Sequence, residues 1–115
     1  MSFTYGFSLH VTVHLAPENV DRFFAAFKPV FEQVIAEDHC VFFEVFRTPG
    51  QPGKISWVED WSCTPDWFLQ NQMTKEYYKE YLAITEPLFI KPREFQFLER
   101  LGPEYFTAKH TQPKQ

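Results

Sequence analysis

Residues 7–15, FSLHVTVHL, constrain the fold of this chain most, because they alternate strictly between apolar and polar side chains. A period of two over such a length predicts a β-strand with one apolar and one polar face. His10 and His14 share the polar face. The rise of a strand separates them by about 13 Å, so one strand cannot present both imidazoles to a single metal ion.

The next segments follow the pattern of a mixed α and β domain. Residues 17–37 carry apolar side chains at three- and four-residue steps, which predicts an amphipathic helix that Pro29 kinks or splits. Residues 40–46 and 55–61 are rich in aromatic and β-branched side chains and predict two strands. The Pro/Gly-rich stretch between them predicts a hairpin with a long turn.

The second half of the chain adds another helix and another strand. We expect Thr64 to cap a short helix, Thr74 to cap a second piece over residues 75–89, and residues 94–101 to form a last strand. The resulting order, βαββαβ, is that of an α+β, ferredoxin-like domain. Such a domain has an antiparallel four-stranded sheet with helices on one face only.

Length and composition indicate one domain that pairs with a second copy. The chain has 115 residues, and we place the domain at residues 1–101 and a polar tail at 102–115. Aromatic residues make up 19% of the chain, more than one small core needs, so some should line a pocket or an interface. A homodimer that covers the bare sheet face is therefore expected, with His10 and His14 facing the second subunit.

Several classes of protein are disfavoured by the composition. A net charge of −4 without a basic stripe argues against nucleic-acid binding, and no apolar run is long enough to cross a membrane. Without a signal-peptide pattern, we expect a cytoplasmic protein with free thiols at Cys40 and Cys63. The scattered histidines and cysteines give no metal signature, and no glycine-rich phosphate loop is present. We therefore expect neither a metal nor a cofactor.

Several motifs resemble those of the antibiotic biosynthesis monooxygenase (ABM) family, whose domains form dimeric α/β barrels. Residues 37–40, EDHC, precede VFFEVFR, and a Gly/Pro loop then leads to ISWVEDW and a helix. The family's small residue or Cys, its aromatic–Glu pair and its acid–Trp pair correspond to Cys40, Phe43-Glu44 and Asp60-Trp61. The resemblance covers roughly residues 7–101.

The resemblance implies a pocket between the sheet and the helices of each subunit. The apolar phase of the first strand faces it in this placement, together with alternate residues of the next two strands and parts of the second helix. The expected substrate-binding residues are Val11, Phe42, Phe46, Trp57, Trp67, Gln70, Asn71, Tyr77, Tyr78 and Tyr81. The expected catalytic residues are Glu44, Glu59 and Trp61.

Such a pocket has a clear chemical use. Aromatic walls stack flat substrates, and a carboxylate among rings loses hydration, so its pKa rises toward that of a general base. A base that removes a phenolic or enolic proton makes an anion that reacts with dioxygen directly. Glu44 and Glu59 are the candidates, although either could instead pair with an arginine or point into solvent. The tyrosines at helical spacing are also typical of an ordinary core.

The chain departs from the family at functional positions. Haem-degrading members use an Asn, a Trp and a His, and the matching positions here hold Val11, Gln70 and Glu80, which argues against haem degradation. Oxygenases that act on polyketide anthrones share Trp61, but this chain has aromatic residues where they hold polar groups: Trp57, Trp67 and Tyr81.

Two classes of function follow. The first is a cofactor-independent monooxygenase that acts on an aromatic, quinol or polyketide-type small molecule, with a cyclase or isomerase of the same fold as its rival. The second is a non-catalytic dimeric domain for ligand binding or assembly. The enzyme hypothesis predicts a carboxylate of raised pKa inside an aromatic cavity that is open to solvent. The binding hypothesis predicts a cavity with every acid in a salt bridge, or no cavity at all.

Overall fold

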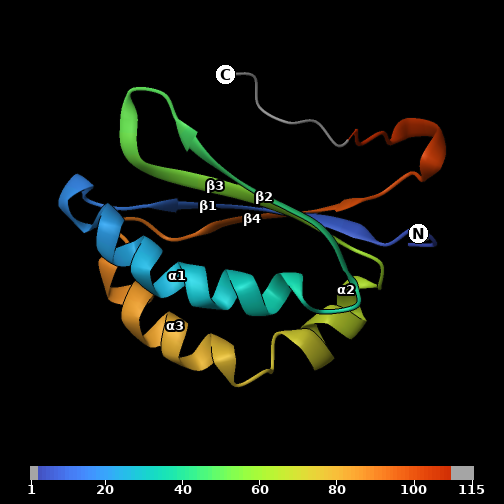
Figure 1. Ribbon diagram of the computed structural model, residues 1–115, viewed down its shortest axis with the longest axis horizontal. Helices are drawn as coiled ribbons and strands as arrows, with labels where there is room; N and C mark the ends of the chain where they lie inside the picture. The colour runs from blue at the N-terminus through green and yellow to red at the C-terminus, as the bar shows by residue number, and fades with distance from the viewer. Residues whose placement is uncertain (1–2, 110–115) are drawn as a thin grey trace.

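The computed structural model describes residues 3–109 and shows a four-stranded antiparallel sheet with helices on one side (Figure 1). The strands are β1 (Phe7–His14), β2 (Cys40–Thr48), β3 (Gln51–Trp61) and β4 (Glu94–Glu99), in the order β2-β3-β1-β4. The helices are α1 (Val20–Ile35), a short α2 (Pro65–Trp67), a π-helical turn η2 (Phe68–Gln72) and α3 (Tyr77–Thr85). The predicted ferredoxin-like βαββαβ fold is confirmed.

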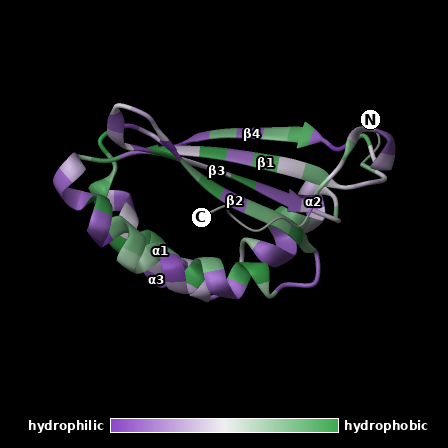
Figure 2. Cartoon of the chain, turned by 45° about the horizontal axis from the view of Figure 1, so that its top comes forward, coloured by the Kyte–Doolittle hydropathy of each residue, from purple (hydrophilic) through white to green (hydrophobic). Residues whose placement is uncertain are grey.

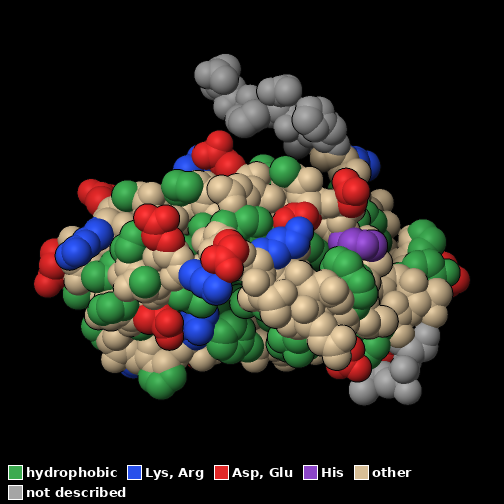
Figure 3. Space-filling model, turned by 90° about the horizontal axis from the view of Figure 1, so that it is seen from below, with side chains coloured by type: hydrophobic (Ala, Val, Ile, Leu, Met, Phe, Trp, Pro, Cys, Tyr) green, Lys and Arg blue, Asp and Glu red, His purple; other side chains and the backbone are tan. Residues whose placement is uncertain are grey.

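Strand β1 occupies the middle of the sheet and sets its two faces. Phe7, Leu9, Val11 and Val13 are each at most 4% exposed and face the helices, while the polar residues between them are half-buried on the open face. Both long helices cover the apolar face (Figure 2). The outer surface of this helix layer carries acidic and basic side chains interspersed with apolar ones (Figure 3). No helix in the described part of the chain could cross a membrane.

The hairpin between β2 and β3 is tighter than predicted. Thr48 pairs with Gln51, so only Pro49 and Gly50 form the turn, and β3 begins four residues earlier than expected. Gly50 has a φ of +79°, which is the conformation that the third position of a Pro-Gly type II turn requires. The long turn was wrongly predicted because the remaining Pro and Gly residues fit within the strand.

The helices differ from the expected ones at Pro29 and Thr74 and agree at Thr64. Helix α1 continues through Pro29 to Ile35, so the proline does not split it. Thr64 caps α2 as predicted, since its hydroxyl accepts a hydrogen bond from the backbone N–H of Trp67 at 3.1 Å. Thr74 does not cap α3, because its hydroxyl donates back to the carbonyl of Gln70 at 3.1 Å. It therefore belongs to the end of the preceding turn.

Gly6 brings the start of β1 against the end of β3. Its φ is +85°, and a Cβ at this position would lie 1.9 Å from the carbonyl oxygen of Trp61. Gly50 has a similar φ of +79°, but a Cβ there would meet no atom within 4 Å. Alanine substitutions at these two positions therefore distinguish backbone strain, which both introduce, from steric overlap, which only Gly6→Ala introduces.

We expect Gly6→Ala to lower the free energy of unfolding by at least about 3 kcal/mol, because strain and overlap add. Gly50→Ala, the matched control, should cost only about 1–2 kcal/mol, since it introduces strain alone. Urea unfolding of both variants measures the difference. Equal losses would contradict the close approach of Gly6 to Trp61.

Candidate active site

Glu59 is a carboxylate buried on the helix-facing side of β3. The alternation of the strand places Trp57 and Trp61 on the same side, one on each flank. Glu59 Oε2 accepts a hydrogen bond from Trp57 Nε1 at 2.8 Å, and its Oε1 accepts one from Trp61 Nε1 at 3.0 Å. None of the ion pairs found within residues 3–109 involves Glu59. Two indoles, rather than a cation, therefore hold this carboxylate.

Burial shifts the pKa of the Glu59 carboxyl group. The loss of hydration raises the pKa of Glu59 to about 7, and the indole N–H groups of Trp61 and Trp57 limit the rise because they favour the ionised form. Both protonation states are therefore populated near neutral pH. This is the property that a general base needs.

Aromatic rings from the helices close over Glu59. Phe27 of α1 packs on Trp57 with ring centroids 4.9 Å apart. Tyr78 and Tyr81 of α3 are buried, and burial raises the pKa of both hydroxyls well above the usual value. The charge of Glu59 adds to the rise at both tyrosines, and the ring of Tyr81 packs edge to face on Phe27 with centroids 6.1 Å apart.

Predicted site residues thus gather in one layer between the sheet and the helices. Val11 joins them from β1, where it lies directly across from Trp57 and is 3% exposed. The predicted residues in this layer are Val11, Trp57, Glu59, Trp61, Tyr78 and Tyr81. Among the residues that the structure describes, no group of His, Cys, Asp or Glu side chains could hold a metal ion.

The predicted placement of Phe42, Glu44 and Phe46 beside the helices is wrong. The pairing of β2 steps from Cys40 to Phe42 while β3 advances by a single residue, which is a β-bulge. Two residues against one reverse the alternation of the side chains that follow, as far as Arg47. Phe42, Glu44 and Phe46 consequently lie on the open face of the sheet, and Glu44 is exposed.

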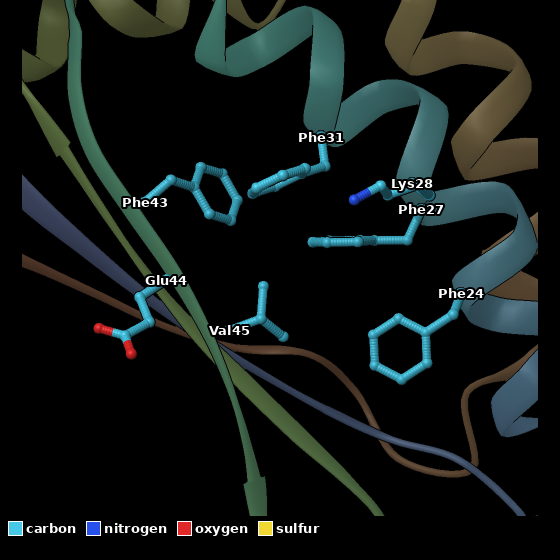
Figure 4. A pocket seen from close by; sticks show the side chains of 7 residues that line it. All are labelled: Phe24, Phe27, Lys28, Phe31, Phe43, Glu44 and Val45. Atoms are coloured by element: carbon cyan, nitrogen blue, oxygen red, sulfur yellow. The ribbon is translucent and has the colours of Figure 1, made fainter. Parts of the chain in front are cut away.

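The same bulge turns the intervening residues of β2 toward the helices. Phe43 lies directly across from Glu59, and Val45 across from Trp57. Together with α1 they form a cavity of about 520 Å³ between the sheet and the helices, and Glu44 alone of its lining residues is among the predicted site residues (Figure 4). Its lining residues are Phe24, Phe27, Lys28, Phe31, Phe43, Glu44 and Val45. Figure 4 shows the carboxylate of Glu44 turned away from the cavity.

Gln72, rather than Gln70 or Asn71, is the buried amide of the second helical segment. Gln72 is 1% exposed, and its Nε2 donates to the hydroxyls of Tyr77 at 2.5 Å and Tyr78 at 2.9 Å. Gln70 and Asn71 are exposed, so the structure does not bring them into the buried layer around Glu59. The cause is the π-helical turn that ends at Gln72, because its wider period shifts the inward side chain.

A second, more polar cavity lies at the end of the helix layer. It has a volume of about 360 Å³ and is lined by Ala36, Glu37, Asp38, His39, Trp61, Trp67 and Gln72. Trp67 is 39% exposed at its rim, so it is removed from the buried layer around Glu59. The Tyr77 hydroxyl and Lys75 Nζ both donate to Glu37, at 2.6 and 2.7 Å. Burial acts to raise the pKa of Glu37, but these hydrogen bonds outweigh it and lower the pKa.

Comparison with known proteins identifies the family. A model of the antibiotic biosynthesis monooxygenase family matches residues 6–80. A protein of Pestalotiopsis microspora, provisionally named a monooxygenase, is 31% identical over 94 residues, which are 82% of this chain and 78% of the relative.

Solved structures share the fold. A provisionally named antibiotic biosynthesis monooxygenase from Nitrosomonas europaea superposes with a TM-score of 0.77 at 16% identity, and the match covers 90% of this chain and 97% of that one. A conserved protein from Methanosarcina mazei Go1 gives a TM-score of 0.75 at 18% identity, covering 84% and 94%. The match to the family model and the 31% identity to the Pestalotiopsis protein show that the chain belongs to the antibiotic biosynthesis monooxygenase family.

Proposed function

We propose that this protein is a monooxygenase that uses no resident cofactor and oxidises a phenolic or enolic aromatic small molecule. The observation that carries the proposal is Glu59, a carboxylate without a cationic partner in the described chain, set among aromatic rings with its pKa raised to about 7. The provisional name of the Pestalotiopsis relative is consistent with this class of reaction.

Glu59 acts as the proton acceptor in this mechanism. It takes the proton of a phenol or enol, while the N–H groups of Trp57 and Trp61 keep its oxygens in place. The resulting anion reduces dioxygen and forms the new carbon–oxygen bond. A CH₂ group becomes a carbonyl, and the second oxygen atom leaves as water, so the substrate supplies all the electrons. Aromatic walls such as Trp57 and Phe27 suit a flat ring system.

The hydrogen-bond and ion-pair partners of Glu37 and Glu59 favour an enzyme over a binding domain. Glu37 is held by Lys75, as a structural acid would be, whereas Glu59 is held only by indoles. A cyclase or isomerase would use the same base without consuming dioxygen, and oxygen uptake separates the two. We also propose that the protein works in the cytoplasm as a homodimer. The open sheet face, with Phe46 46% and Leu98 39% exposed, supports a surface for a second copy.

The first test is oxygen uptake with a panel of hydroquinones and anthrones. Glu59→Gln should lower the rate by at least about a hundredfold, because the base is lost. Glu32→Gln is the matched control, since this carboxylate is exposed on α1 and lines none of the cavities described above, so its removal should leave the rate unchanged. Equal rates of oxygen uptake by wild type and Glu59→Gln would contradict the proposal.

The second test is the pH dependence of kcat/KM. A base must be ionised to accept a proton, so kcat/KM should rise with pH and level off above about 7, where Glu59 has titrated. Stopped-flow measurements between pH 5 and 9 follow this profile. A rate that is constant from pH 5 to 9 would exclude Glu59 as the base.

A third test needs no substrate. The folded state raises the pKa of Glu59 from its usual 4.5 to about 7, so it holds the proton more tightly than the unfolded chain. The resulting stability is fully present below pH 4.5 and is lost as pH rises through about 7. Relative to Glu59→Gln, wild type should therefore lose about 3 kcal/mol of unfolding free energy between pH 4.5 and 8. Urea unfolding of both proteins measures this, and parallel pH curves would contradict a buried, titrating Glu59.

A further inference from the structure

We propose that the cavity between α1 and β2 binds the ring system of the substrate, and that Lys28 pairs there with an acidic group on that substrate. This proposal rests on the proposed function, because it makes the cavity the binding part of the Glu59 site. It narrows the substrate class to flat aromatic molecules that carry an anionic substituent such as a carboxylate.

The cavity has the size and walls of a small-molecule site. Its volume of about 520 Å³ lies within the usual range for ligand pockets, roughly 300–1,000 Å³. Phe31 meets Phe43 edge to face at 5.0 Å, and Phe27 stacks beside Phe31 at 6.1 Å. Figure 4 shows these rings converging from α1 and β2, with Val45 beside them. Ring faces and edges of this kind bind a flat aromatic molecule.

The cavity adjoins the candidate base. Phe43 and Val45 are the cross-strand neighbours of Glu59 and Trp57 on the same face of the sheet. Such neighbours have Cβ atoms about 4.5–5.5 Å apart. Phe27 also belongs to both places, since it lines the cavity and packs on Trp57 at 4.9 Å. A ring in the cavity therefore lies against the aromatic shell of Glu59.

Lys28 supplies the charge. It is the one cationic side chain among the residues that line the cavity, and none of the ion pairs found within residues 3–109 involves it. Its ammonium lies 5.3 Å from the centroid of the Phe31 ring, over a wall of the cavity. The nearby Glu44 turns its carboxylate to the other side of β2 (Figure 4). The charge that this cavity presents to a ligand is thus positive, which selects an anion.

The second cavity has the opposite character. Glu37 and Asp38 both line it; Lys75 pairs with Glu37, but none of the ion pairs found within residues 3–109 involves Asp38, which would repel an anionic ligand. Trp61 and Trp67 offer it aromatic surface as well, so charge rather than ring content distinguishes the two cavities. An anionic aromatic probe should therefore choose the cavity between α1 and β2.

The test uses two fluorescent probes with the same rings. 1-Anilinonaphthalene-8-sulfonate is an aromatic anion, and N-phenyl-1-naphthylamine lacks its sulfonate. Wild type should bind both at one site. Lys28→Gln should weaken binding of the anion about three- to fivefold, as expected for an exposed ion pair, and leave the neutral probe unchanged. Lys79→Gln, on the surface of α3, is the matched control and should change neither.

A filling variant locates the site. Val45→Trp places an indole in the cavity and should abolish binding of both probes. Ala25→Trp instead fills the neighbouring cavity between α1 and α3, and should leave binding intact. Unchanged binding by Val45→Trp, or equal effects of Lys28→Gln and Lys79→Gln, would overturn the proposal.

Methyl NMR of the wild-type protein gives the same answer if Val45→Trp does not fold. The probe rings should shift the Val45 methyl signals and not those of Val58, whose side chain lies on the open face of β3. A larger shift at Val58 than at Val45 would exclude the cavity.

Binding and catalysis can fail separately. Glu59→Gln should bind the anionic probe as wild type does while losing oxygen uptake. Lys28→Gln should raise KM for acidic substrates, and not kcat, because Lys28 positions the substrate and takes no part in proton transfer. Intact binding with no effect of Glu59→Gln on uptake would remove Glu59 as the base and leave the binding site standing. If Lys28→Gln does not weaken binding of the anionic probe but Glu59→Gln still abolishes oxygen uptake, the binding site is excluded and Glu59 remains the base.

Discussion

The two hydrogen bonds that Trp57 and Trp61 donate to Glu59 are the constraint on which the site depends. A carboxylate in this layer would otherwise lose its hydration without compensation, and burial of an unpaired charge costs several kcal/mol. The indoles satisfy one lone pair on each oxygen but bring no positive charge. The acid is therefore stable in its position and still easy to protonate, which a salt bridge to lysine or arginine would prevent.

This arrangement follows from the simplest property of a strand. Residues two apart share a face, so the sequence Trp57-Val58-Glu59-Asp60-Trp61 puts an acid between two indoles on the helix side. The alternation of β1 and β3 was readable from the sequence, and with it the positions of Val11, Trp57, Glu59 and Trp61. Gly6 then brings the end of β3 close to the start of β1, where a side chain would collide with the Trp61 carbonyl.

The errors share a physical cause, which is a local change of period. A bulge after Cys40 adds one residue to β2, and a π-helical turn widens the helix before Gln72. Neither the bulge nor the π-helical turn can be recognised from an alternating or helical sequence pattern, because both depend on how the segment packs against the rest of the fold. Each error moved the inferred site by a residue or two. The alternation predicts an inward Glu44 where Phe43 is inward, and the sequence predicts Gln70 and Asn71 as pocket residues where Gln72 is the buried amide.

The bulge also decides what kind of cavity the protein has. Without it, the face of β2 that meets α1 would carry Glu44 among the phenylalanines, and its carboxylate would oppose Lys28. With it, Phe43 and Val45 meet Phe27 and Phe31 of α1, and Lys28 remains the charge at the cavity. One extra residue thus converts an acidic pocket that would neutralise its own lysine into an apolar one, in which Lys28 forms no ion pair with any residue between 3 and 109. Because the carboxylate of Glu44 on the lining strand points to the other face of the sheet, the proposed pairing of Lys28 requires an acidic group on the ligand.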